Sequence, residues 1–201
     1  ELRAAVHGDD FAVLGWKESL DWFWERISEH FDCKHRGRLG PDSKDVKSIR
    51  ILNRIVTWTQ EGIEYEGDQR HVEIACREYG LKSGSKAILL PGSKEKDCER
   101  DHEVLKDIDA RKYRGCVARM NYLGQDRSDI QFAVKELSKG MSSPTEGDSK
   151  RAKKLLRYLL GVPRYVLKYE YQSMPDSVCV HTDSDFAGRI KTRKSTSGGI
   201  I

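Results

Sequence analysis

The sequence predicts an α+β fold in which a β-hairpin and a helix come first, a group of helices follows, and β-strands end the chain. Three observations predict it. Apolar residues alternate on both sides of a turn in residues 5–14, recur at helical spacing through residues 110–160, and alternate again after Pro163. The chain has 201 residues, of which 37% are hydrophobic and 34% are charged, and this length allows one domain or two small ones.

Composition excludes several classes of protein. No apolar run approaches the roughly 20 residues that span a bilayer, so we expect no membrane partner. Residues 1–6 lack the charged and apolar regions of a secretory signal, which predicts a protein that is not secreted and a chain start that is a cut end. Five cysteines without regular spacing indicate a reducing compartment rather than a disulfide framework. The net charge of +4 suggests a polyanionic partner only weakly.

The first elements follow from local pattern. Two β-prone stretches in residues 5–14 enclose Gly8, Asp9 and Asp10, which predicts a hairpin with the carboxylates at or beside its tip. Residues 17–31 carry apolar side chains at intervals of three and four, which predicts an amphipathic helix that faces a core. Residues 33–47 are polar and read as an exposed connection.

The next segment contains strands and a short helix. Residues 49–59 and 63–66 look like two strands joined by a turn at residues 60–62. A helix over residues 68–79, ended by a glycine, is expected to follow. Residues 82–98 are rich in Ser, Gly and Lys and predict a linker between two subdomains.

The second half predicts three helices, at residues 110–123, 128–139 and 145–160, and then β-segments at residues 165–169, 178–183 and 197–201. The third helix combines one apolar face with the densest basic patch of the chain. The residues of this patch are Lys150, Arg151, Lys153, Lys154 and Arg157. Clustered cations of this kind either contact a nucleic-acid phosphate backbone or form an ordinary solvated helix face, and the pattern leaves both open.

Adjacent aspartates on a tight turn repel each other, and a divalent cation neutralises them naturally. Taken alone, the Asp9-Asp10 dipeptide more often marks a solvated turn. Its surroundings add information, because residues 6–14 read Val-His-Gly-Asp-Asp-Phe-Ala-Val-Leu. This stretch resembles the reverse transcriptase box of an aromatic residue, any residue and two aspartates, with His7 at the place of the usual Tyr.

Two later stretches carry a more specific resemblance. Residues 113–161 contain Met-Asn-Tyr-Leu-Gly, Arg-Ser-Asp-Ile, Met-Ser-Ser-Pro and Lys-Leu-Leu-Arg-Tyr-Leu-Leu-Gly in that order, and resemble the connection region of copia-type long-terminal-repeat retrotransposon polyproteins. Residues 181–199 contain His-Thr-Asp-Ser-Asp-Phe-Ala-Gly and Arg-Lys-Ser-Thr-Ser-Gly-Gly, and are similar to the opening of the same elements' RNase H domain. The three matches occur in the order of the family.

The resemblance implies a function as RNA-directed DNA polymerase with RNase H, which act by two-metal phosphoryl transfer. Asp9, Asp10 and Asp183 would be catalytic carboxylates that bind Mg²⁺, whereas Asp185 is better explained as a surface turn residue. The implied partners are an RNA template, an RNA–DNA hybrid or DNA primer, deoxynucleotides in the complete enzyme, and the remainder of the Pol polyprotein. The implied location is a cytoplasmic virus-like particle or the nucleus.

The resemblance also implies a domain division. Residues 1–81 would be the C-terminal part of the palm and thumb, 82–109 a linker, 110–163 a helical connection region, and 164–201 a truncated start of an RNase H-like domain. Because further carboxylates of both active sites would lie outside the chain, we expect the fragment to be inactive by itself. Two alternatives stay open: a non-catalytic nucleic-acid-binding remnant, and the product of a pseudogene.

Overall fold

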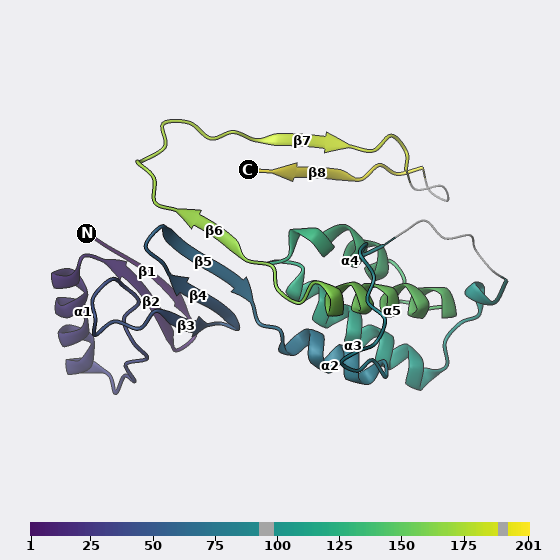
Figure 1. Ribbon diagram of the computed structural model, residues 1–201, viewed down its shortest axis with the longest axis horizontal. Helices are drawn as coiled ribbons and strands as arrows, with labels where there is room; N and C mark the ends of the chain where they lie inside the picture. The colour runs from purple at the N-terminus through teal and green to yellow at the C-terminus, as the bar shows by residue number, and fades with distance from the viewer. Residues whose placement is uncertain (93–98, 189–192) are drawn as a thin grey trace. The chain divides into compact units, whose positions relative to one another are not determined.

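The computed structural model describes residues 1–92, 99–188 and 193–201 (Figure 1). Contacts along the chain divide it into two units, Glu1–Tyr169 and Glu170–Ile201. The chain contains both helices and strands, which agrees with the predicted α+β class. Within the described ranges, no helix is both long and apolar enough to cross a membrane.

The predicted hairpin is present. Strands β1 (Leu2–His7) and β2 (Asp10–Gly15) pair antiparallel, with His7 opposite Asp10, so the loop consists of only Gly8 and Asp9. Gly8 has a φ of 62°, a left-handed conformation that glycine adopts without steric cost. The tight turn therefore follows directly from the Gly-Asp sequence between two β-prone stretches.

Helix α1 (Lys17–His30) forms where its periodicity predicts it, beside the hairpin (Figure 1). The expectation that it faces a core was wrong, because none of its residues is buried. Its apolar side chains, such as Phe23 and Ile27, are half-buried. The helix contacts β2 and the connection at residues 33–47, where Trp24 and His35 make an edge-on ring contact with centroids 4.9 Å apart. A two-stranded ribbon and one connecting segment are too small to cover a helix face.

Strands β3 (Ser48–Ile51), β4 (Arg54–Trp58), β5 (Gly62–Gly67) and β6 (Leu167–Glu170) form one sheet in that order. The prediction of a single strand over residues 49–59 was wrong, because the chain reverses at Leu52 and Asn53. Both residues have positive φ, 48° and 61°, as a two-residue hairpin turn requires. The sequence did not predict this turn, because leucine is uncommon in turns.

The turn before β5 and the helix after it match the predictions. Thr59 Oγ1 accepts hydrogen bonds from the backbone N–H groups of Glu61 and Gly62 and thereby closes the turn at residues 60–62. Helix α2 (Arg70–Glu78) follows β5. It ends at Gly80, whose φ is 67°, and the N–H of the next residue bonds back to the carbonyl of Cys76 at 2.9 Å.

Helices α3 (Asp107–Leu123), α4 (Gln131–Ser138) and α5 (Glu146–Gly161) confirm the three predicted helices, and form a bundle with α2 (Figure 1). Short 3₁₀ turns, Glu99–His102 and Ser128–Ile130, precede α3 and α4. The hydrophobic core lies in this bundle. Its fully buried members include Tyr113, Cys116, Val117, Met120, Ile130, Leu156 and Leu159. The periodic apolar positions of the sequence supply these contacts.

The described part of the predicted linker, residues 82–92, contains no helix or strand and runs along α5. The N–H of Ile88 reaches the carbonyl of Arg157 at 3.4 Å, and Arg157 Nε donates to the carbonyl of Lys86 at 2.6 Å. Residues 93–98 of that prediction lie outside the described ranges. The assignment of residues 82–109 as a linker between subdomains stays a prediction.

In the second unit, β7 (His181–Ser184) and β8 (Ser197–Ile200) pair antiparallel, and all eight residues are exposed. Strand β8 lies within the predicted segment at residues 197–201, and β7 overlaps the predicted segment at residues 178–183 and extends one residue beyond it. The first strand begins at His181 rather than at residue 178, so only the end of the predicted segment is paired.

Candidate catalytic carboxylates and nucleic-acid interface

The hairpin of β1 and β2 places Asp9 and Asp10 at its tip, as predicted. Asp9 is the second residue of the two-residue loop, and Asp10 is the first residue of β2, directly opposite His7. All three side chains are exposed. Adjacent carboxylates on an exposed tight turn supply the hard oxygen donors that Mg²⁺ prefers.

The carboxylate pair is an incomplete donor set for a metal centre in this part of the chain. Among the described residues, no three His, Cys, Asp or Glu side chains are grouped so that they would hold a metal ion. A two-metal phosphoryl-transfer site needs several carboxylates around both ions. Asp9 and Asp10 therefore fit a contribution to such a site rather than the whole of one.

Asp183 is the third residue of β7, where it pairs with Gly198 and is exposed. Its Oδ1 accepts the backbone N–H of Ser184 at 2.8 Å. Asp185 has a different environment, because its backbone N–H donates to the carbonyl of Thr196 at 3.0 Å and its Oδ1 accepts the N–H of the same residue. These bonds hold Asp185 in the connection that follows β7, opposite Thr196.

The basic patch lies on α5, whose first turn is fixed by its own sequence. Thr145 is the N-cap and accepts the N–H of Asp148 at 3.3 Å, while Asp148 Oδ2 accepts the N–H of Thr145 at 2.9 Å. This reciprocal arrangement is a capping box, which satisfies donors that the first helical turn leaves unpaired. It sets the start of the helix and thereby the positions of the cations behind it.

At least three of the predicted cations contact their own chain. Lys150 Nζ lies 2.6 Å from Asp101, Arg151 pairs with Asp148 at 2.7 Å, and Arg157 bonds the carbonyl of Lys86. Lys153 is exposed and Lys154 is half-buried. Part of the patch therefore stabilises the bundle, and the exposed ammonium group of Lys153 is the member best placed to meet a phosphate.

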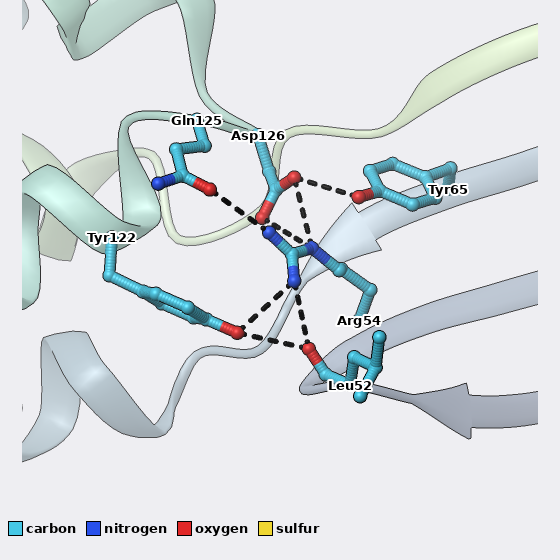
Figure 2. Close-up of polar contacts among 6 residues, drawn as sticks. All are labelled: Leu52, Arg54, Tyr65, Tyr122, Gln125 and Asp126. Atoms are coloured by element: carbon cyan, nitrogen blue, oxygen red, sulfur yellow. Dashed lines mark hydrogen bonds and ion pairs between the residues drawn. The ribbon is translucent and has the colours of Figure 1, made fainter. Parts of the chain in front are cut away.

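A polar cluster joins β4 and β5 to the end of α3 (Figure 2). Arg54 Nε donates to both carboxylate oxygens of Asp126, at 3.2 and 3.1 Å, and Arg54 Nη2 donates to Gln125 Oε1 at 3.3 Å. The Tyr65 hydroxyl donates to Asp126 Oδ1 at 2.7 Å. Burial and the hydrogen bond to Asp126 raise the pKa of Tyr65 to about 12, so this hydroxyl stays protonated.

Tyr122 completes this cluster on the α3 side (Figure 2). Its hydroxyl donates to the carbonyl of Leu52 at 3.0 Å, and the guanidinium of Arg54 lies 5.1 Å from the centre of its ring. Arg54 Nη1 bonds the same carbonyl at 3.0 Å. The left-handed turn at Leu52 is thus fixed by side chains from two elements.

A second cluster explains the Arg-Ser-Asp-Ile stretch on which the sequence resemblance partly rests. Arg127 is only 1% exposed and pairs with Asp129 at 2.7 Å, while the Tyr158 hydroxyl donates to Asp129 at 2.8 Å. Burial alone would raise the pKa of Asp129, but the hydrogen bonds from Arg127 and Tyr158 outweigh it and lower that pKa. Arg127 also donates to the carbonyls of Val162 and Pro163 and so fastens the chain that leaves α5.

Comparison with known proteins places these features in a family. No family model matches the chain, and no solved structure matches it. The retrovirus-related Pol polyprotein from transposon RE2 of Arabidopsis thaliana is 34% identical over 198 residues, which is 98% of this chain. The chain belongs to the copia-type Pol polyproteins. The corresponding protein from transposon RE1 of the same plant is 37% identical over 96 residues, or 48% of the chain.

The match covers 12% of the RE2 polyprotein and 6% of the RE1 polyprotein, so this Pol chain corresponds to a small part of each. An uncharacterized mitochondrial protein of Arabidopsis thaliana is also similar, with 36% identity over 90 residues, 45% of this chain and 37% of that protein. Membership in the Pol family agrees with the resemblance that the sequence motifs carry.

For this Pol segment, the sequence located the exposed aspartates and the basic helix but not the two buried polar clusters. Asp9 and Asp10 share one turn, the cations share α5, and Asp183 belongs to the second unit. The partner of Arg54 lies 72 residues away, and no local pattern indicates such a pair. The Arg-Ser-Asp-Ile stretch was a signal for the second cluster, although its packing role was not inferred.

Proposed function

We propose that this chain is part of the reverse transcriptase and RNase H portion of a retrotransposon Pol polyprotein. Asp9 and Asp10 are metal-binding carboxylates of the RNA-directed DNA polymerase in this proposal. The observation that carries it is the two-residue turn that presents both exposed carboxylates side by side, in a chain related to Pol polyproteins along nearly its whole length.

The reaction of the complete polymerase would join a deoxynucleotide to a primer on an RNA template. Mg²⁺, when bound, would neutralise charge on the transferred phosphoryl group and on the attacking and leaving oxygens. The role of this chain is to hold the two carboxylates at a fixed place, which the short loop with Gly8 in a left-handed conformation achieves. The remaining donors would come from the rest of the Pol polyprotein.

Asp183 is the proposed first carboxylate of the RNase H activity, which cleaves the RNA of an RNA–DNA hybrid with Mg²⁺. Its support is the His-Thr-Asp-Ser-Asp sequence around it and its exposed place on β7. In the same proposal, the protein acts in a cytoplasmic virus-like particle or in the nucleus.

A test in a longer Pol protein separates the two activities. Asp9→Asn and Asp10→Asn are expected to abolish primer extension and leave RNase H cleavage, whereas Asp183→Asn is expected to do the reverse. Asp32→Asn, which changes an exposed carboxylate in the connection after α1, is the matched control and should retain both activities. Primer extension that survives Asp10→Asn would exclude the proposed polymerase site.

The chain by itself is proposed to be inactive in both reactions. Primer extension and hybrid cleavage would be measured with the purified 201-residue chain and, in parallel, with a longer Pol protein as the positive control. Mg²⁺-dependent extension by the short chain, lost in Asp10→Asn, would contradict the proposal.

A second candidate function is nucleic-acid binding without catalysis, and the exposure of Lys153 on α5 favours it. Affinity for an RNA–DNA hybrid would then fall as the salt concentration rises, because lysine and arginine side chains that bind the phosphates displace counterions from them. Lys153→Ala is expected to weaken binding and to reduce the salt dependence, whereas Asp9→Ala with Asp10→Ala should leave binding unchanged. Binding that ignores both salt and Lys153→Ala would exclude α5 as the contact surface.

A further inference from the structure

Strand β6 is hydrogen-bonded to β5 at the edge of its sheet, and charged side chains add to this attachment. Arg164, just before the strand, donates from Nε and Nη2 to the two carboxylate oxygens of Glu66 on β5, at 3.0 and 2.9 Å. Lys168 within β6 lies 3.6 Å from Glu64. Glu64 and Glu66 are two residues apart on one strand, so both carboxylates lie on the same face of the sheet.

Apolar burial adds little to this attachment. Leu167 is half-buried, and the other three residues of β6 are exposed, including Tyr169 with 59% of its surface accessible. The cations are also exposed, with 65% of the Arg164 side chain and 64% of the Lys168 side chain accessible. The carboxylates are less accessible, with 12% of the Glu66 side chain and 30% of the Glu64 side chain exposed, and salt weakens both ion pairs through their exposed cations. The docking of β6 therefore combines backbone hydrogen bonds with ion pairs that depend on ionic strength.

The segment just before β6 is attached in a different way. Buried Arg127 donates to the carbonyls of Val162 and Pro163, at 3.1 and 3.4 Å, and its guanidinium lies 5.4 Å from the ring centre of Tyr165. The Tyr165 hydroxyl also shares a 2.6 Å hydrogen bond with Ser128. The hydrogen bonds from Arg127 are part-buried, and the bond between Tyr165 and Ser128 joins two neutral hydroxyls, so salt that weakens the ion pairs of β6 leaves residues 162–165 anchored.

We propose that β6 is a salt-sensitive strap, which docks on β5 at low ionic strength and detaches at high ionic strength while residues 162–165 remain fixed. Detachment frees residues 166–170, which precede and enter the second unit. Five extended residues span up to about 17 Å. Detachment of β6 therefore lengthens the free linker between residue 165 and the second unit by up to this distance. The inference is independent of the proposed catalytic function.

Hydrogen exchange of the whole chain tests the strap. Peptides that cover residues 166–170 are expected to exchange at least tenfold faster in 500 mM than in 20 mM NaCl, because salt detaches the strand. Peptides from α3 should exchange at the same rate in both, since their hydrogen bonds lie in the bundle core. Exchange of residues 166–170 that is equal at the two salt concentrations in the unmodified chain would overturn the proposal.

Two variants assign the effect to the named ion pairs. Glu64→Gln with Glu66→Gln keeps the size and hydrogen-bonding capacity of both side chains but removes their charge, and should make residues 166–170 exchange fast at both salt concentrations. The matched control is Glu136→Gln on α4, which removes the ion pairs with Lys135 and Lys139 and should preserve the salt response. A salt response that persists in the double variant would also overturn the proposal.

Discussion

Arg54 on β4 donates from Nε to both oxygens of the Asp126 carboxylate, at 3.2 and 3.1 Å, and so ties the sheet to the end of α3. Only 19% of the Arg54 side chain and 7% of the Asp126 side chain are accessible. An intact pair of this kind contributes modestly to the stability of the fold, because both charged groups lose their hydration on burial. Its loss is costly, since removal of one partner leaves the other charge buried and uncompensated.

Arg54→Met is therefore expected to lower the free energy of unfolding by about 3–5 kcal/mol, as measured by urea denaturation. Asp126→Asn added to it should cost less than the sum of the two single changes, with a coupling of about 0.5–3 kcal/mol. Arg26→Met, which removes an exposed pair with Glu29, is the control and should change stability by less than about 0.5 kcal/mol. Equal effects of the two arginine variants would refute the structural role of Arg54.

The pair of Arg127 and Asp129 predicts a pH effect. The pKa of Asp129 is lower in the folded chain than in the unfolded one, where it is about 3.9. Its contribution is thus complete above the unfolded pKa and is lost as pH falls through the folded pKa. The difference in unfolding free energy between the unmodified chain and Asp129→Asn should be constant near neutral pH and shrink below about pH 4.

Urea midpoints from pH 2 to 7 measure that difference. Asp176→Asn is a suitable control, because Asp176 is exposed. A difference between the unmodified chain and Asp129→Asn that is the same at every pH would show that the charge of Asp129 does not stabilise the fold.

The sequence predicted those parts of the fold that depend on neighbouring residues. Apolar residues at three- and four-residue intervals predict helices α3 and α5. A Gly-Asp loop between β-prone stretches predicts the hairpin at Asp9. The exposed face of α1 was not predictable, because periodicity shows that a helix has an apolar face but not what covers it.

The clusters around Arg54 and Arg127 escaped prediction for a related reason. Arg54 and Asp126 are distant in sequence, and either residue alone is an ordinary surface type. The candidate site was partly predictable, because a hairpin pattern alone places Asp9 and Asp10 on one turn. Their proposed chemistry came from the resemblance to the family, since a pair of aspartates on a turn does not specify a reaction.

The capping box of α5 predicts a local contribution to stability. Thr145→Ala removes the side chain that accepts the N–H of Asp148 and is expected to cost about 1 kcal/mol in urea denaturation. Thr145→Ser keeps the hydroxyl and should cost only a small part of that amount. If the two variants are equally destabilised, the methyl group of Thr145 rather than its hydroxyl matters.

The turn between β3 and β4 predicts a stabilising change. Leu52 has a φ of 48°, and a left-handed conformation costs an ordinary residue about 1–2 kcal/mol. Asparagine adopts this conformation more readily, and Leu52 is 39% exposed, so only part of its apolar surface is buried. Leu52→Asn is therefore expected to raise the free energy of unfolding by up to about 1 kcal/mol. The backbone carbonyl of Leu52, which accepts from Arg54 and Tyr122, is kept in the variant.

Leu52→Val gives the matched opposite, because a β-branched side chain is least tolerant of positive φ. It should destabilise the chain relative to leucine, while Leu52→Asn stabilises it, and urea denaturation of the three proteins ranks them. Apolar burial and backbone strain predict different orders of stability for these variants. If the apolar contact of Leu52 decided its effect, asparagine would be worse than valine, and that order would show that strain at this turn is not the dominant energy.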